Sequence, residues 1–113
     1  MTVHVTTRAV GKATVIALEG EINSTTSGGL QAQLLPFIVE FAEVLIDLTG
    51  VTYISSAGLR TLLIVHRRAQ QVAAEIVLIG LSDEVRFVMN ATGFLDFFKI
   101  ADDLDVELER AAR

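Results

Sequence analysis

Two adjacent serines, Ser55 and Ser56, are the residues best placed to do chemistry in this sequence. They follow an apolar run and precede a helical pattern, so we expect their hydroxyls at the N-terminus of a helix. Two interpretations are compatible with that position. One serine can act as the helix N-cap, which contributes about 1 kcal/mol, and one can accept a phosphate, whose negative charge a helix N-terminus accommodates.

A phosphate on this serine pair would change how the surface binds other molecules. It adds about −1.5 to −2 charges and three acceptor oxygens, so a partner pressed against it meets new charge and a desolvation cost. Arg60, four positions after Ser56 on the same expected helix face, could pair with the phosphate or could be an ordinary solvated residue. In open α/β sheets, crevices at the exits of buried strands are where ligands and partners bind. The position therefore indicates a binding surface that phosphorylation can control.

Enzymatic chemistry has little support in the sequence. Residues 55–58, Ser-Ser-Ala-Gly, lack the first glycine of the GxSxG nucleophile elbow of hydrolases. His66 lies ten positions after Ser56 on the same expected helix, about 15 Å away at ~1.5 Å per residue, which is too far for it to act as a base. No GxGxxG follows an expected strand. We therefore expect no catalytic residues and no enzyme.

Composition argues against a metal, a cofactor and several kinds of partner. The 113 residues include no cysteine, and the two histidines, His4 and His66, lie far apart, so we expect neither a metal site nor another cofactor. The 14 acidic and 9 basic side chains give a net charge of −5, which disfavours nucleic acids. Apolar runs are shorter than the ~20 residues that cross a membrane. Because the N-terminus also lacks signal-peptide features, we expect a cytoplasmic protein that binds no membrane.

Hydrophobic periodicity predicts the elements that precede the serines. Residues 3–18 alternate as two strands around a glycine-lysine turn, which predicts a hairpin. Residues 24–27 supply N-cap side chains for a first helix, whose apolar positions recur over residues 30–41. Pro36 should break or kink that helix about one turn earlier.

A continuous apolar run at residues 44–48 predicts a central strand, buried on both faces of a parallel sheet. Residues 49–56 have no helical periodicity and are expected to form a connection. A second helix should begin at Ala57 or Gly58, and residues 76–79 repeat the pattern of a buried strand.

The remaining elements complete an α/β domain. Ser82 should cap a short helix that stops at Gly93, residues 97–100 indicate an edge strand, and a last helix should begin at residues 102–103. Because 113 residues with 51% apolar content suit one core, we expect a single domain over residues 1–113. The expected architecture is a mixed sheet of four to five strands with about four helices packed on it.

Three sequence blocks resemble the STAS family, and within it the single-domain bacterial anti-sigma factor antagonists. GEIN at residues 20–23 is similar to the family's GELD. Residues 47–59, DLTGVTYISSAGL, resemble its D-L-S/T-x-V-x-F/Y-M/I-D-S-S/T-G-L signature, which is the most specific of the three blocks. Residues 82–94, from SDEV to ATGF, are similar to its S-P-x-V…G-L segment. The resemblance implies a mixed sheet with helices on one side.

The resemblance also implies a function, which is partner switching. An unphosphorylated antagonist of this family binds an anti-sigma factor that is also a serine kinase, and so frees the sigma factor. Phosphorylation of the motif serine, which is Ser56 by position, abolishes the binding, and a serine phosphatase restores it. The residues expected at the partner-binding surface are Asn23, Ser24, Thr25, Ser55, Ala57, Gly58, Leu59 and Arg60.

Three positions depart from the family pattern. Ser55 stands where the family has an aspartate, Asn23 replaces the aspartate of GELD, and Ala57 replaces a serine or threonine. Two carboxylates are therefore missing near the site, and Ser55 is a second hydroxyl beside the expected acceptor. The Gly-Leu register favours Ser56 as the acceptor.

Two other functions stay open at this point. A STAS scaffold subunit of a larger signalling assembly would use the same fold for self-association, although such scaffolds usually carry an extra N-terminal domain, for which this chain has no room. Scattered polar residues could instead form a small-molecule site. No long exposed apolar stripe is evident in the pattern, so we expect a monomer.

Overall fold

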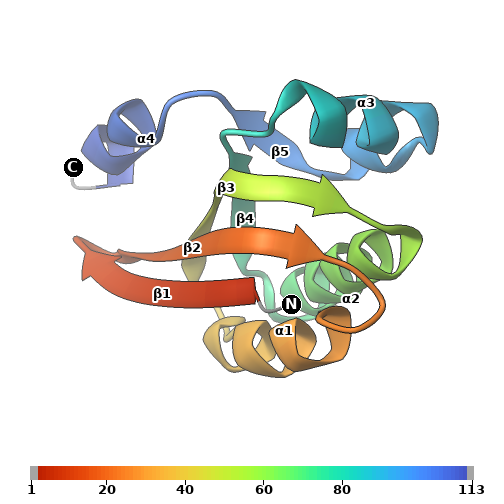
Figure 1. Cartoon of the computed structure of the whole chain (residues 1–113). Coiled ribbons are helices and arrows are strands. Elements are labelled where there is room, and N and C mark those ends of the chain that lie inside the picture. The colour runs from red at the N-terminus through yellow and green to blue at the C-terminus, as the bar shows by residue number, and fades with distance from the viewer. Residues whose placement is uncertain (1–2, 112–113) are drawn as a thin grey trace.

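In the computed structural model, which describes residues 3–111, the chain starts with the expected hairpin (Figure 1). Strand β1 (Val3–Val10) pairs antiparallel with β2 (Ala13–Ile22), with Val10 opposite Ala13. Gly11 makes the intervening turn with φ at 58°, a conformation that glycine adopts at little cost. The hairpin prediction is confirmed.

The remaining strands run parallel to β2. Strand β3 (Glu43–Ile54) pairs with β2 and β4 (Glu75–Ile79), and β4 pairs with β5 (Lys99–Ala101). The order across the five-stranded sheet is β1-β2-β3-β4-β5, so the predicted central position of β3 is confirmed. The mixed α/β fold class is confirmed as well.

The connection predicted for residues 49–56 is wrong, because β3 continues to Ile54. Its second half pairs with the end of β2, with Val51 opposite Gly20 and Ile54 opposite Ile22. The register shifts on either side of Glu19 and Gly20, which lets the two strands stay paired without a regular apolar pattern. The serines are therefore held directly at the end of a strand.

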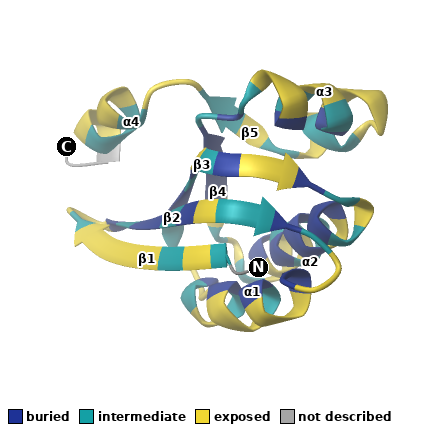
Figure 2. Ribbon diagram, viewed as in Figure 1, coloured by how far each residue is buried: buried dark blue, intermediate teal, exposed yellow. Residues whose placement is uncertain are grey.

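Helices cover both faces of the sheet. Helices α1 (Ser27–Leu34), α2 (Ser56–Val72) and α3 (Asp83–Ala91) contribute to the main core, whereas α4 (Leu104–Ala111) packs on the other face (Figure 1). In β3, Val44 and Ile46 belong to the main core, and Leu45 between them faces α4. Burial is concentrated on the middle strands and the inner sides of α1 and α2 (Figure 2).

The one-sided arrangement implied by the family resemblance is thus wrong for this chain. Leu45, Val77 and Ile79 form an apolar surface on the second face, and Leu104 and Leu108 of α4 cover it. Because apolar side chains alternate across a strand that is buried on both sides, the second face also needs a cover.

The first helix is shorter than the apolar pattern predicts. Helix α1 ends at Leu34 and continues as a 3-10 turn, η1 (Leu35–Phe37), around Pro36. The break before the proline is confirmed, since proline cannot continue the backbone hydrogen bonding of an α-helix. Phe41, predicted on the helix, lies beyond this break with φ at 63° and is 74% exposed.

The later elements follow the predictions with small shifts. Helix α2 begins at Ser56, one residue before the predicted start, and α3 is capped by Ser82 and followed by Gly93 at φ 79°, as predicted. The edge strand begins two residues later than predicted, because a 3-10 turn, η2 (Phe94–Phe97), precedes it.

Candidate partner-binding site at the start of helix α2

The N-terminus of α2 lies directly against the ends of β2 and β3. The Ser55 amide donates a hydrogen bond to the Ile22 carbonyl at 2.8 Å. A Cβ atom on Gly58 would lie 2.7 Å from Ile22 Cγ2 and 2.8 Å from Ile54 Cγ1, closer than real Cβ contacts come. Only glycine at this position lets the first turn of α2 approach the two strands so closely.

The two serines have different environments. Ser55 is the N-cap of α2: its Oγ accepts a hydrogen bond from the Gly58 amide at 3.2 Å, which confirms the capping interpretation. Ser56 is the first helical residue and is exposed. Within residues 3–111, no side-chain hydrogen bond occupies Ser56 Oγ, so this hydroxyl is free to react while that of Ser55 is engaged.

A second loop lies at the same edge of the sheet. It follows β2, and because Ile22 pairs with Ile54, the residues after these two strands are neighbours. Asn23 Oδ1 accepts hydrogen bonds from the amides of Thr25 (2.9 Å) and Thr26 (3.2 Å). Asn23 therefore holds the turn before α1, whose N-cap residue Thr26 makes no side-chain capping hydrogen bond, so the N-cap side chain expected from residues 24–27 is not used for capping. Ser24 and Thr25 are exposed at the tip of the loop.

The predicted partner-binding residues divide into an exposed and a supporting set. Ser24, Thr25 and Arg60 are exposed, and Asn23, Ser55 and Ala57 are half-buried. Gly58 and Leu59 are buried, with Leu59 only 2% exposed, so they position the surface from within the core.

A groove that includes Tyr53 and Ile54, the two residues before Ser55, was not predicted from the sequence. It has a volume of about 400 Å³ and lies between the end of β3 and helix α3. Asp83 and Glu84 are typical of the first turn of any helix, so they do not indicate a groove. The one sequence feature that could have indicated it is Phe87, a large apolar residue on the exposed side of α3. The lining residues are Tyr53, Ile54, Asp83, Glu84, Val85, Phe87 and Val88.

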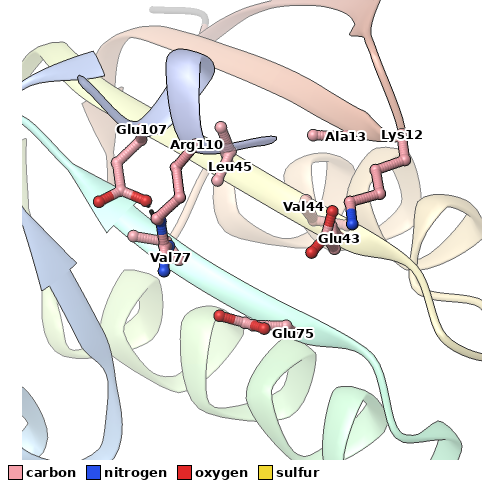
Figure 3. Close-up of a pocket in the computed structure, with 9 residues that line it drawn as sticks. All are labelled: Lys12, Ala13, Glu43, Val44, Leu45, Glu75, Val77, Glu107 and Arg110. Carbon is pink, nitrogen blue, oxygen red and sulfur yellow. Dashed lines mark hydrogen bonds and ion pairs between the residues drawn. The ribbon is translucent and has the colours of Figure 1, made fainter. Parts of the chain in front are cut away.

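A second hollow, of about 230 Å³, lies under α4 at the other end of the parallel strands (Figure 3). Glu107 and Arg110 of α4 reach over β3 and β4 and form an ion pair at 2.6 Å, and Glu75 pairs with Lys99. The hydrogen bond from Lys99 lowers the pKa of the Glu75 carboxyl. Lys12 and Glu43 also line this hollow without an ion pair among residues 3–111, and Glu43 Oε2 is buried there without a hydrogen-bond partner. Leu104 and Leu108, which pack on the apolar surface of the sheet, attach α4 beside it.

Within residues 3–111, histidines and carboxylates form no group of three or more that could hold a metal ion. None of the helices in this part of the chain is long and apolar enough to cross a membrane.

Fold and site together define a STAS domain. The model of the STAS domain family matches residues 4–106, so the chain belongs to this family, as the three sequence blocks predicted.

The chain is similar in sequence to proteins described as anti-sigma factor antagonists. The chain is 38% identical over 89 residues to BtrV of Bordetella bronchiseptica, described as a candidate anti-sigma factor antagonist, covering 78% of this chain and 77% of BtrV. It is 35% identical over 86 residues to the anti-sigma-B factor antagonist of Listeria monocytogenes, covering 75% of each. The phosphorylated form of the Bacillus protein SpoIIAA shares the fold, with a TM-score of 0.71, 20% identity, and coverage of 95% of this chain and 98% of that one.

Proposed function

We propose that this chain is an anti-sigma factor antagonist that works by partner switching, with Ser56 as the phosphate acceptor. The unphosphorylated surface around α2 binds an anti-sigma factor with serine kinase activity, and this binding frees the sigma factor in the cytoplasm. Phosphorylation of Ser56 ends the binding, and a serine phosphatase restores it. The chain is then a regulator that acts by binding, with no reaction of its own.

The observation that carries this proposal is the separation of roles between Ser55 and Ser56. The Ser55 hydroxyl is engaged with the Gly58 amide, whereas Ser56 is exposed at the first helical position. A kinase can therefore reach Ser56 without unfolding the helix. The proposal is also supported by the similarity to the antagonists of Bordetella and Listeria, and by the fold shared with phosphorylated SpoIIAA.

A phosphate on Ser56 would leave the fold intact and weaken the binding of the partner. The free amides and positive dipole end of α2 favour negative charge at this position. Arg60 is exposed four residues further along the same helix and is available to pair with the phosphate. A partner that covers Ser56 would instead have to desolvate the new charge.

The missing family aspartates change the charge of the surface and keep its shape. Asn23 Oδ1 accepts from two backbone amides and Ser55 Oγ accepts from one, which are hydrogen bonds that a carboxylate could also accept. The surface around Ser56 therefore lacks two negative charges, while the backbone amides of Thr25, Thr26 and Gly58 keep a side-chain acceptor. We propose that the cognate partner carries fewer basic side chains opposite Asn23 and Ser55 than partners of antagonists with both aspartates.

Phosphorylation can be tested directly with the purified chain. Incubation with ATP and a lysate of its source cells, followed by intact-mass and phosphopeptide analysis, should add one phosphate on Ser56. The phosphate should be lost in Ser56→Ala and kept in Ser55→Ala. Labelling of Ser55 in the Ser56→Ala variant would show that the assignment of Ser56 as the acceptor is wrong. The absence of any phosphate under both growth and stress conditions would favour a constitutive scaffold.

A binding experiment tests the switch itself. The unphosphorylated chain should retain a serine kinase from the same lysate. The chain phosphorylated on Ser56 should not retain that kinase. Recovery of the same proteins by both forms would contradict partner switching even if Ser56 is phosphorylated.

A further inference from the structure

The groove between β3 and α3 is largely apolar, and its lining comes within one residue of Ser55 along the chain. Tyr53 and Ile54, which immediately precede Ser55, form one wall, and α3 forms the other. A stable protein interface takes about 20–30 residues on each side. The loops around Ser24 and Ser56 supply fewer than that, so a partner that covers Ser56 must extend over neighbouring surface.

Two large aromatic side chains stand exposed along the groove. Tyr53 is 49% exposed and Phe87 is 73% exposed. Phe87 is held in this position by its helix, because Val85 and Met89 on the inner side of α3 are buried in the main core. Exposed aromatic residues on a fixed element are typical of the energetic centres of protein interfaces.

The groove has an acidic rim. Asp83 and Glu84 lie in the first turn of α3, and both are exposed. Among residues 3–111, neither carboxylate forms an ion pair, and the nearby cation Arg86 is engaged with Asp102 at 3.0 Å. Asp83 lies four residues before Phe87, so charge and aromatic ring share one side of the helix.

We propose that this groove receives an apolar side chain flanked by lysine or arginine from the protein partner. The apolar side chain packs between Tyr53 and Phe87, and the flanking cations face Asp83 and Glu84. The inference rests on the proposed function, because it makes the groove the second half of the surface that Ser56 controls.

Short peptides test the chemistry of the groove. Two N-acetylated, C-amidated tripeptides, Arg-Leu-Arg and Glu-Leu-Glu, are titrated into the full chain while backbone amide NMR signals are followed. The Arg peptide should shift the signals of Tyr53, Val85 and Phe87, and the Glu peptide should leave them unchanged. Equal shifts with both peptides, or no shift at millimolar concentration, would overturn the proposal. Shifts that depend on protein concentration without peptide would assign the groove to a second copy of the chain and overturn it too.

Matched variants connect the groove to a complete partner. Phe87→Ala should weaken binding of the kinase recovered with the unphosphorylated chain by about tenfold. Phe41→Ala is the control, because Phe41 is 74% exposed near the opposite end of β3. The double variant Asp83→Asn, Glu84→Gln should weaken binding several-fold and reduce its salt dependence.

The two proposals fail in different ways. If Ser56 is phosphorylated and controls binding, yet Phe87→Ala binds the kinase like the unmodified chain, the groove proposal is wrong and the switch stands. If Ser56 is never phosphorylated, yet the Arg peptide occupies the groove, the switch is wrong and the groove remains a binding site.

Discussion

Thr49 occupies the space into which a side chain on Gly80 would project. Gly80 follows β4 with φ at 72°, and a Cβ built on it would overlap Thr49 Oγ1. The Thr49 hydroxyl is itself held by a hydrogen bond to Asp47 Oδ1 at 2.5 Å, so it cannot easily move aside. Glycine at position 80 therefore lets the chain leave β4 directly against Thr49 of β3.

Gly80→Ala should therefore destabilise the protein for two reasons. The positive φ is costly for alanine, and the new methyl group meets Thr49; we expect a loss of roughly 1–3 kcal/mol in the free energy of unfolding. Urea unfolding followed by circular dichroism measures it. In a Thr49→Ala background, which lacks the overlapping Oγ1 atom, Gly80→Ala should cost less if the contact with Thr49 matters, and an equal cost in both backgrounds would assign the loss to φ alone.

Gly58→Ala should reverse the usual effect of replacing a glycine within a helix. Alanine ordinarily stabilises a helix interior by about 0.5–1 kcal/mol. At Gly58, the added methyl group would press on Ile22 and Ile54, so we expect a net loss of stability and weaker partner binding. Gly29→Ala in α1 is the matched control, because nothing lies within 4 Å of its Cβ position. Unfolding midpoints that rise for both variants would disprove the close packing.

Substitutions of Ser55 and Ser56 should have different effects on stability. Ser55→Ala removes the N-cap of α2 and should cost about 1 kcal/mol, whereas Ser56→Ala should change stability by less than about 0.5 kcal/mol. Thermal and urea unfolding of the two purified variants measure this difference. A larger loss in Ser56→Ala than in Ser55→Ala would contradict the capping geometry.

Acid should weaken the attachment between β4 and β5. The hydrogen bond from Lys99 lowers the pKa of Glu75 below its ordinary 4.5, so the ionised carboxylate is favoured in the folded state. Its contribution to stability is present above the unfolded-state pKa and is lost as pH falls through the lower folded-state pKa. The Glu75 side chain is 44% exposed, so the contribution is small and screened by salt.

The variant Glu75→Gln measures this contribution. At low salt, its stability deficit against the unmodified chain should be larger at about pH 7 than at about pH 3. A deficit that does not change between the two pH values would show that the lost group acts through packing, and not through its charge.

Local patterns predicted most of the elements, because their causes are local. The run at residues 44–48 identified the central strand, Ser82 and Gly93 marked the ends of α3, and Pro36 marked the break after α1. The serine pair was placed correctly at the start of a helix for the same reason.

The errors arose where distant residues decide the structure. The second half of β3 is a strand because it pairs with β2 across a register shift, and nothing in residues 49–54 alone requires that. The groove depends on where α3 lies relative to Tyr53, which no local pattern in residues 83–88 specifies. In the same way, α4 covers the second face because Leu45 and Val77, far from it in the sequence, leave apolar surface there.

The strand order β1-β2-β3-β4-β5 has a consequence for how the chain folds during synthesis. Each strand pairs with the one made just before it, so the sheet can grow from one edge as residues leave the ribosome. The elements that hold Ser55 and Ser56 are β2, β3 and α2, which are complete once Val72 has emerged. The groove additionally needs α3, so a stalled or truncated chain would present the serine pair before the groove has formed.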